Sequence, residues 1–220
     1  MRHKNSKNIT NKKLTQFSKK FNKTQTNKVL KNVNTKGYFE NLIIKSDYLQ
    51  NKKRTFKNMI NTETKITNQE NSGRCWIFAF LNVIRIPMIK KYKLKDFEFS
   101  QNYLFFYDKL EKANYFLNFM IKNKNTNLND LKMIYMLDNL TNDGGQWNMF
   151  VNLIEKYGIV PQSVMPESYQ SSQSYLMNRF ITRKLREFAS ELRNSHKKGV
   201  SILQLRKNKE EMMATIYNML

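Results

Sequence analysis

Cys75 is the residue of this chain whose type and position best suit nucleophilic chemistry. It is the one cysteine among 220 residues, and it follows Gly73 at the start of the apolar run 75–88, which predicts a buried helix. The N-terminus of a helix stabilises negative charge and so favours the reactive thiolate form of a cysteine. The alternative interpretation is an inert cysteine that fills space at the start of a helix.

Two further features could assist such a nucleophile. Gln69 lies six residues before Cys75, and its side-chain amide is of the kind that stabilises a developing oxyanion; the alternative is a glutamine in a surface loop. Gly144 and Gly145 lack a Cβ, so an extended peptide could approach their backbone closely. The alternative is a simple turn that opens the following helix.

The chain holds two histidines, and we expect neither to act as a general base. His196 lies in a polar, lysine-rich segment that ends an amphipathic helix, where the helix dipole favours an imidazole. His3 lies in the polar N-terminal tail. Two histidines and one cysteine cannot build a zinc site, and no phosphate-binding loop or dinucleotide fingerprint is present. The sequence therefore predicts a nucleophile, an oxyanion donor and part of a cleft, with no metal or cofactor.

Three blocks of the sequence resemble one branch of the papain-like cysteine peptidases, that of bleomycin hydrolase and aminopeptidase C. Residues 68–78 read Asn-Gln-x-x-Ser-Gly-Arg-Cys-Trp-x-Phe, and Arg74 stands where papain-like enzymes usually carry a small residue. Residues 97–109 resemble a helix opening of this branch, and residues 143–169, which begin Asp-Gly-Gly-Gln-Trp, resemble its substrate-cleft segment. The resemblance covers roughly residues 60–220.

The resemblance implies an α+β papain-like fold, with this chain forming mostly the helical lobe and the β-barrel lobe largely missing. It implies an aminopeptidase in which Cys75 attacks the peptide carbonyl, Gln69 belongs to the oxyanion hole, and Gly144 and Gly145 contact the peptide substrate. Relatives are roughly twice as long and carry the catalytic histidine and asparagine in their second half. We therefore expect a truncated chain that is inactive alone. Relatives form hexamers, so a homo-oligomer is expected.

The net charge of +22 is concentrated in residues 1–60, which hold 16 Lys/Arg and 2 Asp/Glu. Such a basic arm could bind nucleic acid weakly, or it could be a solvated segment of biased composition. Two functions therefore stay open beside the peptidase. One is a degenerate peptidase-like binding or assembly piece, and the other is a basic module associated with nucleic acid.

The candidate site residues must be held in place by secondary structure, and the sequence predicts mostly helices. Residues 1–36 are expected to be a flexible basic extension, and residues 37–220 the helical-lobe part of a peptidase domain, with a first helix at 37–60. A helix is expected over 75–88, and Pro87 should kink or end it. A second helix is expected to begin after Ser100, its predicted N-cap, and a loop is expected over 122–130. A helix is expected to begin after Gly144-Gly145 and to end at Gly158. A long amphipathic helix is expected over 175–195, with Phe180 on its apolar face. The last helix is expected to begin with a capping box formed by Asn208 and Glu211.

No apolar run is long enough to cross a bilayer, so no membrane partner is expected. One cysteine and no apolar segment of a secretory leader indicate a reducing, cytoplasmic location. Without a second lobe, we expect an uncovered apolar patch at the helix faces that carry Phe78, Leu81, Phe106 and Phe150.

Overall fold

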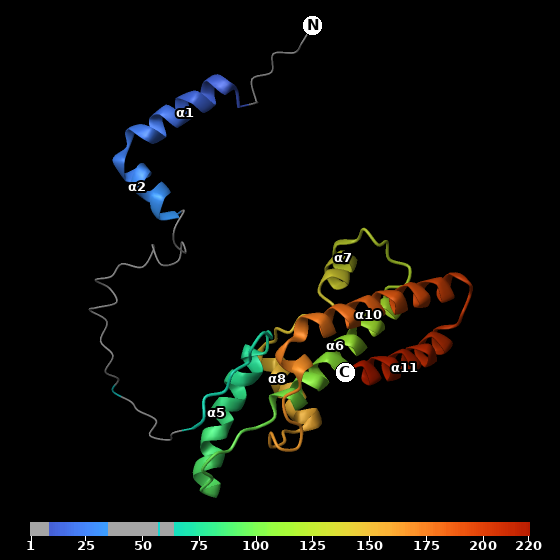
Figure 1. Ribbon diagram of the computed structural model, residues 1–220. Helices are drawn as coiled ribbons and strands as arrows, with labels where there is room; N and C mark the ends of the chain where they lie inside the picture. The colour runs from blue at the N-terminus through green and yellow to red at the C-terminus, as the bar shows by residue number, and fades with distance from the viewer. Residues whose placement is uncertain (1–8, 35–56, 58–63) are drawn as a thin grey trace. The chain divides into compact units, whose positions relative to one another are not determined.

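The computed structural model describes residues 9–34, 57 and 64–220, and it divides the chain into two compact units, Met1–Ile60 and Asn61–Leu220 (Figure 1). The helix predicted over 37–60 lies outside the described residues, save residue 57. The domain boundary predicted at residue 36 stays a prediction. Within the described ranges the chain forms helices and two isolated bridges between extended residues, and it has no strand.

In the residues of the first unit that the structure describes, the chain forms α1 (Asn11–Lys23) and α2 (Gln25–Asn34), within the segment where the sequence predicts a flexible extension. The Asn- and Lys-rich composition of these residues hides an amphipathic pattern, and the flexibility of the extension stays a prediction. Thr10 caps α1 through its hydroxyl, which accepts from the Lys13 N–H at 3.4 Å. The apolar side chains of α1 recur at helical spacing on one exposed face, and they are Leu14, Phe17 and Phe21.

The second unit is built around α6, a 22-residue helix that contacts four other helices. Its helices are α5 (Cys75–Tyr92), α6 (Gln101–Lys122), α7 (Leu131–Asp138), α8 (Trp147–Tyr157), α9 (Tyr169–Ser172), α10 (Ser174–Lys197) and α11 (Ile202–Met219). One end of α6 packs against α5 and α8, and the remainder packs against α10 and α11 (Figure 1). None of the helices in the described part of the chain is long and apolar enough to cross a membrane.

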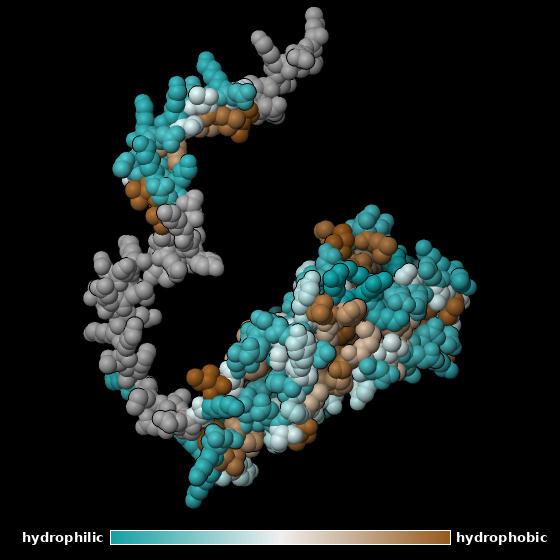
Figure 2. Space-filling view, viewed as in Figure 1, coloured by the Kyte–Doolittle hydropathy of each residue, from teal (hydrophilic) through white to brown (hydrophobic). Residues whose placement is uncertain are grey.

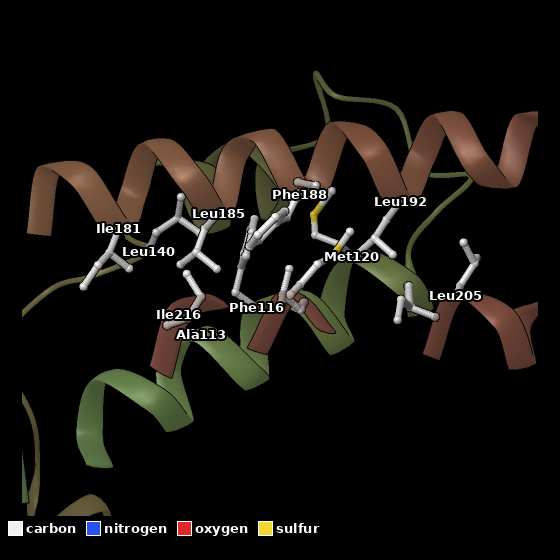
Figure 3. Close-up of a cluster of buried hydrophobic side chains, with 14 of the residues drawn as sticks. Ala113, Phe116, Met120, Leu140, Ile181, Leu185, Phe188, Leu192, Leu205 and Ile216 are labelled. Carbon is white, nitrogen blue, oxygen red and sulfur yellow. The ribbon is translucent and has the colours of Figure 1, made fainter. Parts of the chain in front are cut away.

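Two apolar cores hold this unit together. In the first, side chains of α10 interdigitate with those of α6 and α11, as Figure 3 shows for Phe116, Leu185 and Ile216. The second lies between α5, α6 and α8 and includes Trp76, Leu81, Leu104 and Phe150. The expected uncovered patch is therefore wrong in its main members, because Phe78, Leu81 and Phe150 are buried within this chain and Phe106 is half-buried. The surface of α7 does carry exposed apolar side chains (Figure 2), namely Leu131, Ile134 and Tyr135.

The ends of α5 and α6 and the buried face of α10 can be compared with the predictions. Ser100 is the N-cap of α6, since its hydroxyl accepts from the Tyr103 N–H at 3.0 Å. Pro87 does not end α5, which continues to Tyr92. Phe180 is 61% exposed, and the buried position of that turn is its neighbour Ile181.

The predicted start of the last helix is wrong. Asn208 lies inside α11, which begins at Ile202 after the N-cap Ser201, whose hydroxyl accepts from the Gln204 N–H at 3.2 Å. The Asn208–Glu211 spacing imitates a capping box, but the chain is already helical there. The helix α7 was not predicted from the sequence.

Candidate active site

Cys75 is the first residue of α5, and its thiol is free and exposed. The N-cap residue, Arg74, makes no side-chain hydrogen bond to the first turn of the helix. The first N–H groups of α5 therefore lack the side-chain acceptor that usually satisfies a helix start, and they are available to a negatively charged atom beside the thiol. The sequence prediction of a cysteine at a helix N-terminus is met by this geometry.

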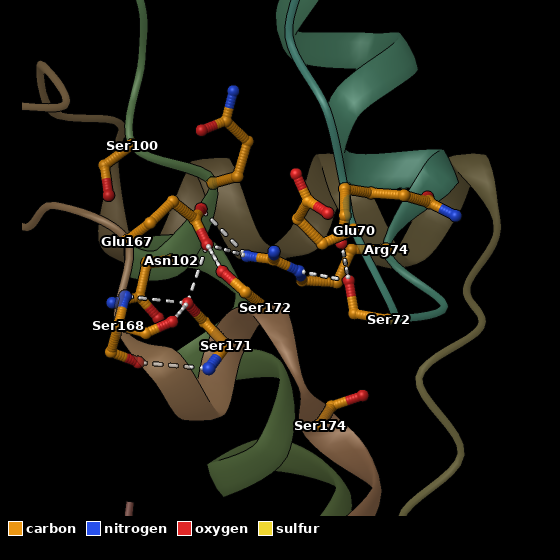
Figure 4. A network of polar contacts seen from close by, with 12 residues as sticks. Glu70, Ser72, Arg74, Ser100, Asn102, Glu167, Ser168, Ser171, Ser172 and Ser174 are labelled. Atoms are coloured by element: carbon orange, nitrogen blue, oxygen red, sulfur yellow. Dashed lines mark hydrogen bonds and ion pairs between the residues drawn. The ribbon is translucent and has the colours of Figure 1, made fainter.

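The residue before the thiol is fixed by a buried ion pair (Figure 4). The Arg74 side chain is fully buried, and its Nη1 lies 2.9 Å from Glu167. Its Nε donates to the Ser72 hydroxyl at 2.8 Å, and its guanidinium lies over the rings of Phe78 and Phe105. A buried ion pair with this many contacts sets one position for the backbone next to Cys75.

The turn that carries Gln69 is held at both ends. The Ser72 hydroxyl donates to the Gln69 carbonyl at 2.6 Å, and the Asn71 N–H donates to the Ser172 carbonyl at 3.0 Å. The side-chain oxygen of Gln69 is buried and has no hydrogen-bond partner in the described part of the chain. This unpartnered oxygen is a hydrogen-bond acceptor, so an oxyanion would have to be bound by the amide nitrogen, the donor of the same side chain.

We call residues 141–145 the glycine loop and residues 68–78 the cysteine segment. The glycine loop packs directly on the cysteine segment. A Cβ at Gly145 would lie 2.4 Å from the indole ring of Trp76, so any larger residue here would force the loop or the ring to shift. Both backbone groups of Gly144 are engaged, because its N–H donates to the Asn142 side chain at 2.7 Å and its carbonyl accepts from Lys112 at 2.9 Å. Neither backbone group of Gly145 has a hydrogen-bond partner among the described residues.

Sequence reasoning missed Asp143, the residue that precedes this glycine pair. Its carboxylate accepts from the Gly73 N–H at 3.0 Å, from the Lys109 ammonium at 2.5 Å, from the Ser174 hydroxyl at 2.6 Å and from the Asn178 amide at 2.7 Å. Burial would raise the pKa of this carboxyl, but the charge of Lys109 and the hydrogen bonds from Lys109, Ser174 and the Gly73 N–H lower it to about 2. Asp143 is therefore ionised at neutral pH.

Lys109 was also missed, although the sequence carries a signal for it. It falls on the stripe of α6 that includes Phe105 and Ala113, so a lysine stands where the helix faces the core. Burial lowers the pKa of Lys109 to about 8, although Asp143 favours its charged form. A lysine on an apolar stripe predicts a buried partner, and the sequence does not say which carboxylate that partner is.

His196 lies far from the cysteine. It sits in the last turn of α10, where its Nε2 is 2.8 Å from the Asn125 side-chain oxygen. Ser174, at the other end of the same helix, bonds Asp143. The 22 residues between Ser174 and His196 correspond to about 33 Å of helix. Within the described ranges the chain brings no histidine to Cys75, as the sequence predicts.

A helical lobe that begins its buried helix with an exposed cysteine is the architecture of the papain-type cysteine peptidases. Within that class, the chain belongs to the Peptidase C1-like family, whose model matches residues 8–220. It is 38% identical to bleomycin hydrolase of Rattus norvegicus over 216 residues, which make up 97% of this chain and 48% of that relative. It is 46% identical to aminopeptidase C of Listeria innocua over 165 residues, 75% of this chain and 36% of that relative.

The crystal structure of PepW from Lactobacillus rhamnosis HN001 superposes with a TM-score of 0.90 at 38% identity, covering 98% of this chain and 48% of that one. The chain thus spans about half the length, or less, of these relatives. The family predicted from the three sequence blocks is confirmed, and so is the papain-like fold class with this chain as mostly its helical lobe. The roles of Cys75, Gln69, Gly144 and Gly145 stay predictions.

Proposed function

We propose that the whole protein is a cysteine-type aminopeptidase and that this chain supplies its nucleophile. The observation that carries the proposal is the exposed Cys75 thiol at the uncapped start of α5, six residues after Gln69. The family membership and the identity to an aminopeptidase C support the same chemistry. A cytoplasmic location accords with this family of relatives and is part of the proposal.

In the proposed mechanism, the Cys75 thiolate attacks the carbonyl carbon of a peptide and the amine leaves, which gives an acyl-enzyme that water then hydrolyses. The Gln69 amide and the backbone N–H of Cys75 would donate to the oxyanion of the tetrahedral intermediate. The free backbone groups of Gly145 suit it to bind the substrate backbone, whereas those of Gly144 are engaged within the protein. The base that takes the thiol proton would come from residues outside this chain.

The activity is tested with a chimera in which this chain is followed by the part of PepW that lies beyond its match. Because the two helical lobes superpose with a TM-score of 0.90, the second part is expected to dock. We expect the chimera to hydrolyse an aminoacyl-coumarin substrate, the Cys75→Ala chimera to be inactive, and chain 1–220 alone to show no turnover above its own Cys75→Ala control. A chimera that folds and stays inactive would contradict the proposal and favour the degenerate binding piece.

The oxyanion role of Gln69 is tested in the same chimera. Gln69→Ala is expected to lower kcat about 100- to 1,000-fold with a smaller effect on KM, because the amide would act only on the developing negative charge. Ile66→Ala, which shortens an exposed side chain three residues before Gln69, is the control. Equal kcat values for Gln69→Ala and the unchanged chimera would remove this assignment.

A second candidate function belongs to the basic arm. Residues 9–34 contain seven lysines and no Asp or Glu, so a segment of one charge sign is helical in the structure. We propose weak, sequence-independent binding of nucleic acid to this arm, to be measured by gel shift of the full chain with duplex DNA over a range of salt. The affinity should fall steeply with salt, because phosphate neutralisation releases counterions. Binding that does not change with salt would exclude it.

The oligomeric state is part of the same proposal. We propose a homo-oligomer for the whole protein, and a hexamer by resemblance to the branch. Light scattering of the chimera at several concentrations measures it, and a monomer at every concentration would contradict it.

A further inference from the structure

The cysteine segment and the glycine loop interlock through one glycine on each side. A Cβ at Gly73 would lie 2.8 Å from the Cβ of Asp143, and a Cβ at Gly145 would lie 2.4 Å from the Trp76 ring. Each segment therefore presents a glycine to a side chain of the other. Two backbones that approach so closely cannot shift past each other without breaking this contact.

Asp143 bonds to residues on both sides of Cys75. Its carboxylate accepts from the Gly73 N–H at 3.0 Å, and its backbone carbonyl accepts from the Trp76 Nε1–H at 2.8 Å. Those two partners stand two positions before and one position after the thiol. One residue of the glycine loop thereby fixes the start of α5 from both directions.

The position of Asp143 is itself set by α6. The buried Lys109 ammonium donates to its carboxylate and also to the Thr141 carbonyl at 2.6 Å. One turn further along the same helix, Lys112 donates to the carbonyls of Asn142 and Gly144 at 2.5 and 2.9 Å. Two lysines of one helix therefore hold four consecutive residues of the loop. A loop with so many charge-assisted bonds has one conformation.

We propose that Asp143 is a positioning residue, which together with Lys109 sets where the Cys75 thiol and the start of α5 lie relative to the substrate-contacting Gly145. The proposal rests on the proposed peptidase function for its consequence in catalysis. The contacts of Asp143 do not depend on that function. They fix the residues on both sides of Cys75, so they should affect any reaction of its thiol.

The single cysteine makes the position of the thiol measurable in chain 1–220 without any peptidase activity. The rate of alkylation by iodoacetamide at pH 7 is compared for the unchanged chain, Asp143→Ala and Leu185→Ala. Leu185 is fully buried in the core between α6, α10 and α11, so its truncation destabilises the fold without touching the cysteine segment. We expect the alkylation rate of Asp143→Ala to differ about fivefold from that of the unchanged chain, because the start of α5 beside the thiol loses its fixed arrangement, and Leu185→Ala to react at the unchanged rate.

A second variant separates position from stability. Lys109→Met combined with Asp143→Leu replaces the buried ion pair by apolar side chains, so it should melt at a higher temperature than Asp143→Ala. It still lacks an acceptor for the Gly73 N–H, so its alkylation rate should differ from that of the unchanged chain as the rate of Asp143→Ala does. Unchanged alkylation in any folded variant without Asp143 would overturn the proposal. If neither variant folds, hydrogen exchange of the Gly73 amide in the unchanged chain decides, since slow exchange is expected and fast exchange would overturn the bond to Asp143.

The chimera with PepW supplies the catalytic arm of the test. There Asp143→Ala is expected to lower kcat at least tenfold while KM changes less, and Asp138→Ala, at an exposed carboxylate, should leave both unchanged. An inactive chimera would count against the proposed peptidase function alone, because the alkylation rates would still report on Asp143. An active chimera in which Asp143→Ala keeps its kcat would count against the positioning role alone.

Discussion

Arg74 shows how a single residue can carry both a family signature and a structural role. Its guanidinium is fully buried and finds a carboxylate, a hydroxyl and two aromatic faces around it. A smaller residue here would leave Glu167 without its cation and would leave a cavity between Phe78 and Phe105. The side chain next to the nucleophile is thus part of the framework that joins α5 to the segment before α9.

At the residue scale we predict that Glu167→Gln costs about 3–5 kcal/mol of folding free energy, because it leaves the buried charge of Arg74 without its partner. Glu187→Gln is the matched control, since Glu187 pairs with Lys184 on the surface and such pairs contribute about 0–1 kcal/mol. Urea unfolding followed by circular dichroism measures both. Equal losses in the two variants would mean that the buried pair contributes no more than a surface pair.

The two glycines of the loop should respond differently to one added methyl group. Gly145→Ala forces a Cβ against the Trp76 ring, and overpacking of this kind costs about 1–3 kcal/mol. Gly144→Ala meets the Asn142 side-chain oxygen at 3.1 Å, which a small rotation relieves. We expect a clear loss of melting temperature for Gly145→Ala and a smaller one for Gly144→Ala. The reverse order would show that the loop does not pack on Trp76.

At the scale of elements, the sequence predicted those helices that carry their own signals. Ser100, Gly158 and the apolar run after Cys75 each mark a helix end or face through local chemistry. The predictions failed where two local patterns compete: Asn208 offers a capping box inside a helix that Ser201 had already started. Asp143 and Lys109 could not be paired from sequence, because a buried lysine announces a partner but not its position along the chain.

The start of α11 can be tested directly. Ser201→Ala should cost about 1 kcal/mol, because the Gln204 N–H loses its acceptor, whereas Asn208 is half-buried in the helix interior and caps no helix end, so Asn208→Ala should cost less. Chemical denaturation of the two variants gives the comparison. A larger loss for Asn208→Ala would restore the capping box that the sequence suggested.

At the scale of the whole molecule, acid stability should depend on Asp143. The folded state lowers the pKa of its carboxyl from 3.8 to about 2, so its contribution is complete above pH 3.8 and is lost as the pH falls from 3.8 toward 2. Asp108 acts in the opposite sense, because burial raises its pKa despite the opposing charge of Lys112, so a comparison of variants is needed. The melting temperature of Asp143→Ala should therefore fall less steeply over this window than that of the unchanged chain. Parallel curves would contradict the shift.

The distant groups that fix the residues just before Cys75 come later in the chain. Gly73 is bonded to a residue 70 positions onward, Arg74 to one 93 positions onward, and Asn71 to one 102 positions onward. During synthesis on the ribosome, the contacts that fix the start of α5 cannot all form until Gln173 has been made. Contacts of such long range form late in folding because the intervening chain must be ordered first. The nascent protein therefore passes through a stage in which Cys75 is present and the site around it is not.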